Sequence, residues 1–196
     1  MSSNAKPTRE AVLESAIAAF ARKGYAGTSV HDILRVSGLS KPTLYYYFGS
    51  KEGLFRAILE SAYDGLHAAM QSSVKEADDC MTRLTGITTA IFQFTIAHQH
   101  LMRLVFATLF AAPEEIPLSS VNPERRRRVF NLVKRVVSKG RKEGVLTGLY
   151  TADELTHAFF GTVSHQIRTW LFRAEGSLSR TRARRIVSLF LDGATK

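Results

Sequence analysis

The chain has 196 residues, of which 45% are hydrophobic and 22% are charged, and its formal net charge is +10. This length and apolar content support a folded core of one or two domains and exclude a largely disordered chain. The polar start MSSNAKP has no apolar run behind it, and the longest apolar stretch, residues 104–112, is too short to cross a bilayer, so we expect no secretory signal, no membrane span and a cytoplasmic protein.

Residues 29–55 predict two short helices joined at a glycine, followed by the start of a third helix. Ser29 can cap the first helix, and Asp32, three residues later, can complete a capping box. Gly38 supplies the turn, and Ser40 can cap the second helix. Two helices in this arrangement are typical of a helix-turn-helix that reads DNA.

The second short helix, predicted over residues 40–47, sorts its side chains into rows. If Leu44 and Phe48 turn inward, a step of about 100° per residue places lysine, threonine and tyrosine side chains on the outward rows. These side chains supply the donors that phosphate oxygens and base edges in a major groove require. Half-buried packing of the three consecutive tyrosines is the alternative interpretation.

These residues resemble the N-terminal domain of TetR/AcrR-type transcriptional regulators. The resemblance runs from about Thr8 to Phe55. It is carried by AIAAFARKGYAGTSV (16–30), ILRVSGLSKPTLYYYF (33–48) and SKEGLF (50–55). Two residues depart from the family pattern, because Ser37 stands where alanine is usual and Pro42 where glycine is frequent. Both fit the geometry of the turn and of a first helical turn.

The resemblance also implies which residues contact DNA. They lie at the start of the first short helix, in the second, and at the start of the following helix: Ser29, His31, Lys41, Pro42, Thr43, Tyr45, Tyr46, Tyr47 and Lys51. We expect the Lys51 ammonium to add to a phosphate site at a helix N-terminus. For His31, a merely solvated side chain is the alternative to a contact.

The remaining chain also predicts helices, since it has no alternating strand pattern and no hairpin turn signal. We expect an all-α fold of about nine helices, over residues 8–24, 29–37, 40–47, 51 to about 74, 78–98, 100–111, 122–142, 151–174 and 179–193, the first four by the resemblance. Asp78 is the expected cap of the fifth helix. Residues 1–50 form the predicted helix-turn-helix domain, and residues 51–196 form the predicted effector-binding and dimerisation domain.

Residues 87–112 could line a cavity together with aromatic residues further along the chain. The predicted ligand-binding residues are Phe92, Gln93, His98, Met102, Phe106, Phe110, Phe159 and Trp170. Ordinary core packing is the alternative for each of them. The family normally holds a small-molecule effector here. Because no carboxylate lies between Asp79 and Glu114, we expect an apolar effector that is neutral or acidic rather than cationic.

The two C-terminal helices carry wide apolar faces, with Phe159 and Trp170 on one and Phe190 on the other. A monomer needs only one buried stripe per helix. In relatives these helices pair with their copies in a four-helix interface, so the resemblance implies a homodimer that reads a palindromic operator in double-stranded DNA. Packing inside one chain is the alternative.

The positive charge is concentrated near the C-terminus rather than in the predicted DNA reader. Residues 121–196 carry 16 Lys and Arg against 6 Asp and Glu, whereas residues 1–60 carry 8 against 5. Solvated helix faces explain this pattern. An anionic partner, either flanking DNA or an acidic effector, is the alternative.

The sequence contains no HExxH, CxxC, GxSxG or glycine-rich phosphate loop, and His98 and His100 point to different sides of a helix. We therefore expect no enzyme, no metal and no cofactor. The prediction is a DNA-binding transcriptional regulator, by family habit a repressor, that binds its operator as a dimer and is released by a small-molecule effector. A nonspecific, basic, helical nucleic-acid-binding protein is the alternative.

Overall fold

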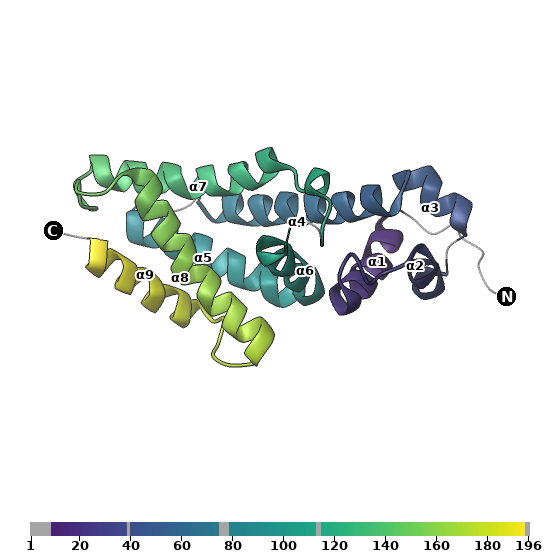
Figure 1. The fold of residues 1–196 in the computed structure, drawn as a ribbon. Coiled ribbons are helices and arrows are strands. Elements are labelled where there is room, and N and C mark those ends of the chain that lie inside the picture. The colour runs from purple at the N-terminus through teal and green to yellow at the C-terminus, as the bar shows by residue number, and fades with distance from the viewer. Residues whose placement is uncertain (1–8, 39, 75–78, 113–114, 195–196) are drawn as a thin grey trace. The chain divides into compact units, whose positions relative to one another are not determined.

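The computed structural model describes residues 9–38, 40–74, 79–112 and 115–194 (Figure 1). Within these ranges the chain is all-α and has no β-strand. The elements are α1 Arg9–Lys23, α2 Val30–Ser37, α3 Lys41–Phe48, α4 Lys51–Val74, α5 Cys80–Ala97, α6 Gln99–Phe110, the 3-10 helix η1 Leu118–Ser120, α7 Pro123–Lys142, α8 Ala152–Arg173 and α9 Arg180–Ala194. The all-α prediction is confirmed, and each predicted helix is present with its ends within two residues of those expected.

Side-chain caps set several of these helix starts. The Asp32 N–H donates to Ser29 Oγ at 3.1 Å, and the Asp32 carboxylate accepts from the Ser29 N–H at 3.0 Å, which is the predicted capping box. Thr151 and Glu154 form the same reciprocal pair at the start of α8. Such bonds satisfy backbone N–H groups that have no partner inside the helix. The local sequence therefore determines where these helices begin.

Two predicted helix starts fall outside the described residues. They are Thr8, the expected first residue of α1, and Asp78, the expected cap of α5. Asp79 caps α5 in the structure, accepting the Thr82 N–H at 2.7 Å.

The chain divides into two compact units. The first comprises residues 1–62 and 100–122, and the second comprises residues 63–99 and 123–196. The continuous helix α4 contributes residues to both units. The predicted boundary at residue 50 separates a DNA reader from an effector domain by function, and it stays a prediction.

The first unit has a small aromatic core beneath its short helices. Phe20 of α1 and Phe55 of α4 are fully buried, with ring centroids 5.0 Å apart in an edge-to-face arrangement. The Tyr25 ring lies 4.8 Å from Phe55. Ile33 of α2 and Leu44 of α3 are also fully buried, so each short helix is anchored by an apolar side chain.

In the second unit α5 packs against α7 and α9, and α8 packs against α7 and α9. Phe159 of α8 is fully buried, and its ring meets that of Phe190 edge to face at 5.7 Å. The buried hydroxyls of Thr88 and Thr95 donate to carbonyls one turn earlier on α5, both at 2.8 Å. These two threonines therefore satisfy their hydrogen bonds within their own helix. No described helix is long and apolar enough to span a membrane.

Two substitutions on α3 test this anchoring. Leu44→Ala deletes a fully buried side chain, and we expect it to lower the free energy of unfolding by about 2–5 kcal/mol. Tyr46→Ala, on the exposed face of the same helix, should change it by no more than about 0.5 kcal/mol. Urea unfolding followed by circular dichroism measures both. Equal effects of the two substitutions would contradict the inward placement of Leu44.

Candidate nucleic-acid interface and cavity

The outward face of α3 is formed by its three consecutive tyrosines. Tyr46 is 84% exposed, Tyr45 41% and Tyr47 37%. Leu44 points into the core and Phe48 is half-buried, as the predicted rows require. The exposures favour the outward interpretation of the tyrosines over packing, and their contact with DNA stays a prediction.

The other predicted contact residues of α3 lie beside the tyrosines. Lys41 and Pro42 are exposed at its start. The Lys41 ammonium lies 6.0 Å from the centroid of the Tyr45 ring, so these two side chains share one flank of the helix. Thr43 is half-buried, and its hydroxyl is 2.7 Å from Ser40 Oγ. This face offers a cation, several hydroxyls and three aromatic rings, which are the groups that bind phosphates and base edges.

The start of α2 is held by a network centred on Asp32. The Lys23 ammonium contacts its carboxylate at 2.8 Å, and the Ser29 hydroxyl donates to it at 2.7 Å. The hydrogen bond from Lys23, followed by those from Ser29, holds the pKa of Asp32 well below its usual range. The carboxylate is therefore ionised at neutral pH, and its stabilising effect is lost only as strong acid protonates it. His31 is exposed, as both interpretations of it require.

Lys51 binds protein carbonyls rather than pointing freely outward. Its ammonium donates to the carbonyl oxygens of Tyr25 at 2.9 Å and Thr28 at 2.8 Å, and it lies 4.1 Å from the centroid of the Tyr25 ring. Burial lowers the pKa of the amine. The structure thus gives Lys51 a role that the sequence did not predict, because it ties the turn between α1 and α2 to the start of α4. Its predicted phosphate contact stays untested and would use the one remaining N–H.

Replacing Lys51 by methionine separates these two roles. Methionine keeps the apolar stem but removes two charge-assisted hydrogen bonds, so the free energy of unfolding should fall by about 1–3 kcal/mol. If the ammonium acts mainly on the turn, the dependence of duplex binding on salt concentration should keep its slope. Chemical unfolding and a salt titration of duplex binding measure the two effects. Unchanged stability with a shallower salt slope would instead identify Lys51 as a phosphate ligand.

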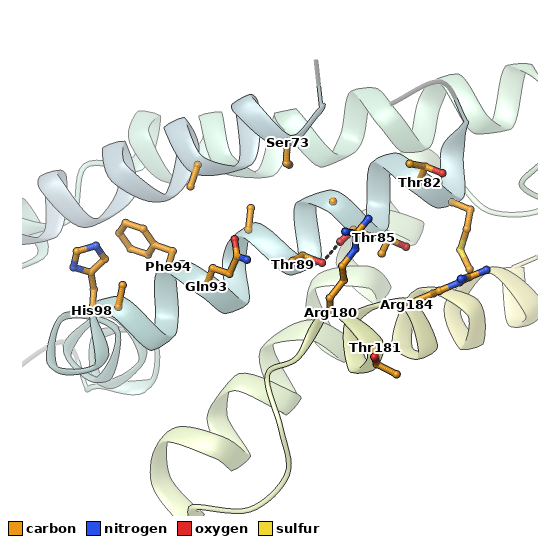
Figure 2. Close-up of a pocket in the computed structure, with 15 residues that line it drawn as sticks. Ser73, Thr82, Thr85, Thr89, Gln93, Phe94, His98, Arg180, Thr181 and Arg184 are labelled. Atoms are coloured by element: carbon orange, nitrogen blue, oxygen red, sulfur yellow. Dashed lines mark hydrogen bonds between the residues drawn. The ribbon is translucent and has the colours of Figure 1, made fainter. Parts of the chain in front are cut away.

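The second unit contains a cavity of about 1150 Å³ along one side of α5, and it is open to solvent (Figure 2). Residues of α4 form one wall and residues of α9 the other. Threonines of α5 and Arg180 and Arg184 of α9 lie at one end, and Phe94 and His98 lie at the other. Among the described residues no group of His, Cys, Asp and Glu side chains is arranged to hold a metal ion.

The eight predicted ligand-binding residues do not come together at this cavity. Gln93 and His98 line it. Phe92 and Phe159 are buried in the second unit, and Trp170 is half-buried on α8. Met102 and Phe106 are buried in the first unit, and the side chain of Phe110 is not described. Sequence reasoning did not select the arginines of α9, although they stand in the basic run that it noted. No local pattern in the sequence indicated that these arginines would lie beside α5.

Comparisons with known proteins agree with this fold. The sequence model of the family described as "Bacterial regulatory proteins, tetR family" matches residues 12–58, which include α2 and α3. The HTH-type transcriptional repressor KstR2 of Mycobacterium tuberculosis (strain ATCC 25618 / H37Rv) is 26% identical over 189 residues, covering 96% of this chain and 93% of that protein. The solved structure of the ketosteroid transcriptional regulator KstR2 of that species has a TM-score of 0.76 at 23% identity and covers 100% of this chain and 97% of that one.

Two further solved structures show the same fold. The TetR family transcriptional regulator PfmR from Thermus thermophilus has a TM-score of 0.78 at 26% identity and covers 97% of this chain and 99% of that one. The transcriptional regulator FadR from Bacillus subtilis, solved in complex with stearoyl-CoA, has a TM-score of 0.75 at 18% identity, covering 95% and 99%, a likeness of fold alone. Residues 12–58, with their capped α2 and α3 and exposed tyrosine face, match the DNA-binding domain of the TetR family, and the chain resembles regulators of that family along its whole length.

Proposed function

We propose that this regulator is a repressor that binds a two-fold operator as a homodimer in the cytoplasm and is released by a small-molecule effector. The observation that carries the proposal is the exposed face of α3, where Lys41 and three tyrosines surround a helix anchored by the buried Leu44. A short helix of this kind reaches only a few base pairs, so two copies give a longer and more specific site.

Within the proposed complex, the side chains of α3 divide into base-reading and phosphate-binding groups. Thr43, Tyr45 and Tyr46 carry hydroxyls that can address base edges, whereas the Lys41 ammonium suits a phosphate. Ser29, His31, Pro42, Tyr47 and Lys51 complete the proposed contact set. A nonspecific basic protein would bind any duplex with a common salt dependence and no such division.

Binding to a duplex selected from a random pool tests whether base-reading and phosphate-binding side chains of α3 differ as proposed. Tyr45→Ala should change the preference among variants of that duplex by about 1–3 kcal/mol for a lost base contact, while Lys41→Ala should weaken all duplexes alike. Gln71→Ala, on an exposed part of α4, is the control and should change neither. Fluorescence anisotropy gives the affinities. If Tyr45→Ala weakens every duplex equally, Tyr45 does not read bases.

The surface of α8 and α9 supports the proposed dimer, but through different residues from those first expected. Phe190 is buried against Phe159 inside the chain, so it serves intrachain packing. Leu189, beside it on α9, is 69% exposed, and Phe172 of α8 is also exposed. A hollow of about 320 Å³ adjoins Leu189 on the faces of α8 and α9. Leu189 lines this hollow, and an exposed apolar side chain beside a hollow is typical of a surface that a second copy covers.

Leu189→Glu should therefore give monomers with full helical content and weakened operator binding, since a charge buried at the interface without a partner is costly. Leu109→Glu on α6 makes the same change at an exposed apolar residue outside α8 and α9, and should leave the dimer intact. Sedimentation velocity at micromolar concentration distinguishes the two. A dimeric Leu189→Glu protein, or a monomeric parent protein, would remove α9 from the interface.

The cavity supports the proposed effector. Its volume of about 1150 Å³ is enough for a small organic molecule. One protein of this fold was solved in complex with stearoyl-CoA, so a ligand with a large apolar part occurs among proteins of this fold. We propose an effector with an apolar body, neutral or acidic. To release DNA it must bind the state that does not bind the operator more tightly than the state that does.

A further inference from the structure

The cavity is long rather than compact. Its lining on α5 extends from Thr82 to His98, and at 1.5 Å of rise per residue this corresponds to about 24 Å along the helix. Ser73 of α4 lies on the opposite side of the cavity from Arg180 and Arg184 of α9 (Figure 2), and Ala69 of α4 also lines the cavity. The shape therefore favours an extended occupant over a compact one.

One end of the cavity carries positive charge that no described residue neutralises. Arg180 and Arg184 stand one turn apart on α9 and both line the cavity, and the Arg180 side chain reaches toward Thr85 and Thr89 of α5 in Figure 2. Neither forms an ion pair or hydrogen bond with the residues that the structure describes, and none of the lining residues is Asp or Glu. Arg182, between them, donates instead to Gln166 Oε1 at 2.8 and 3.1 Å. Like charges one turn apart on a helix repel, so an anion between Arg180 and Arg184 would stabilise both.

A hydroxyl without a partner lies at the same end. The Thr85 hydroxyl oxygen is buried and has no hydrogen bond among the described residues. The neighbouring hydroxyls are already used, because Thr89 donates to the Thr85 carbonyl at 2.8 Å and Thr82 donates to the Asp79 carboxylate at 2.5 Å. Buried hydroxyls are nearly always hydrogen-bonded in folded proteins. The Thr85 hydroxyl can thus donate to a ligand oxygen held beside the arginines.

The other end is lined by Gln93, Phe94, Ala97 and His98, without Lys, Arg, Asp or Glu. The rings of Phe94 and His98 lie together, with centroids 4.5 Å apart. Between the two ends, Ala90 of α5 and Ala69 of α4 line the cavity, and these small side chains leave room for a chain of methylene groups. The lining thus changes along its length from two arginines and several hydroxyls to alanine and aromatic side chains, with Gln93 and His98 as the polar groups of that end.

We propose that this cavity binds an extended amphiphile with a single terminal acid group. The acid lies between Arg180 and Arg184 and accepts a hydrogen bond from the Thr85 hydroxyl, and the apolar body runs along α5 toward Phe94. The acid can be a carboxylate or a phosphate, since both accept hydrogen bonds from arginine. The amphiphile's role as the effector rests on the function proposed above, whereas its binding to the cavity does not.

Four probes with the same twelve-carbon chain test the proposal: dodecanoate, dodecyl phosphate, dodecanol and dodecylammonium, each below its micelle concentration. Isothermal titration calorimetry with the full chain should show at least one of the two acids binding about ten-fold or more tightly than the alcohol and the amine. The ratio between the two acids identifies carboxylate or phosphate as the preferred group. Equal affinity for the alcohol and both acids would overturn the proposal.

Charge-neutral variants locate the acid. The double substitution Arg180→Gln and Arg184→Gln should reduce the affinity for the preferred acid by about ten-fold or more and leave dodecanol binding unchanged. Arg173→Gln with Arg185→Gln removes the same charge from exposed positions that do not line the cavity, and it is the matched control. Equal weakening by both pairs would show a general electrostatic effect and overturn the assigned position.

Thr85→Val and Ala90→Phe test the rest of the cavity. Thr85→Val removes an unpartnered hydroxyl, so it should weaken acid binding without lowering the stability of the ligand-free protein. Ala90→Phe fills the middle of the cavity and should abolish binding of every probe. Retained acid binding in Ala90→Phe protein that is folded by circular dichroism would place the amphiphile elsewhere.

Operator binding measured with and without the preferred acid separates this inference from the proposed function. If the protein binds its selected duplex and neither acid, the inference about the cavity is wrong and the proposed regulatory function remains supported. If the acid binds through Arg180 and Arg184 but no duplex is retained specifically, the cavity assignment stands and the proposed repressor fails. Release of the duplex by the acid, lost in the Arg180→Gln and Arg184→Gln protein, supports both.

Discussion

The proposed DNA-reading surface of this protein depends on the anchoring of a helix of only eight residues. An isolated helix as short as α3 is unstable in water, so its conformation must come from its caps and from the packing of Leu44. Phe20 of α1 and Phe55 of α4 form the aromatic core of the same unit, and the Lys51 ammonium fixes the turn that leads into α2. Because these interactions stabilise α3 through its inner face, the three exposed tyrosines on its outer face are not needed for folding.

Charge is arranged in two different ways along the chain. On α7, Arg125 and Arg128 both pair with Asp64 of α4, so part of the basic run is neutralised inside the second unit. On α9, Arg180 and Arg184 have no such partner among the described residues. The net charge of +10 therefore does not distinguish arginines that are paired within the fold from arginines that are available to a ligand. Only the available ones are informative about binding.

Helix α4 gives the proposed regulation a physical route. It runs without a break from Lys51, which holds the turn before α2, to Val74, and Ala69 and Ser73 near its end line the cavity. A ligand that contacts Ser73 differently in two states would bias the position of a helix that also anchors the DNA reader. A coupling of this kind must be reciprocal, because the operator then changes the affinity of the ligand by the same factor.

The sequence by itself determined where the helices lie and identified the helix-turn-helix. Capping pairs such as Ser29 with Asp32 and Thr151 with Glu154 lie three residues apart, and a helical repeat is read over one or two turns, so both signals are local. The tertiary structure alone decided which side chains meet. Lys51 binds carbonyls more than twenty residues earlier, Phe190 turns inward while Leu189 stays exposed, and Arg180 faces Thr85 across the cavity. Such contacts depend on how helices pack, and packing angles and registers are set by the fit of whole surfaces rather than by neighbouring residues in the chain.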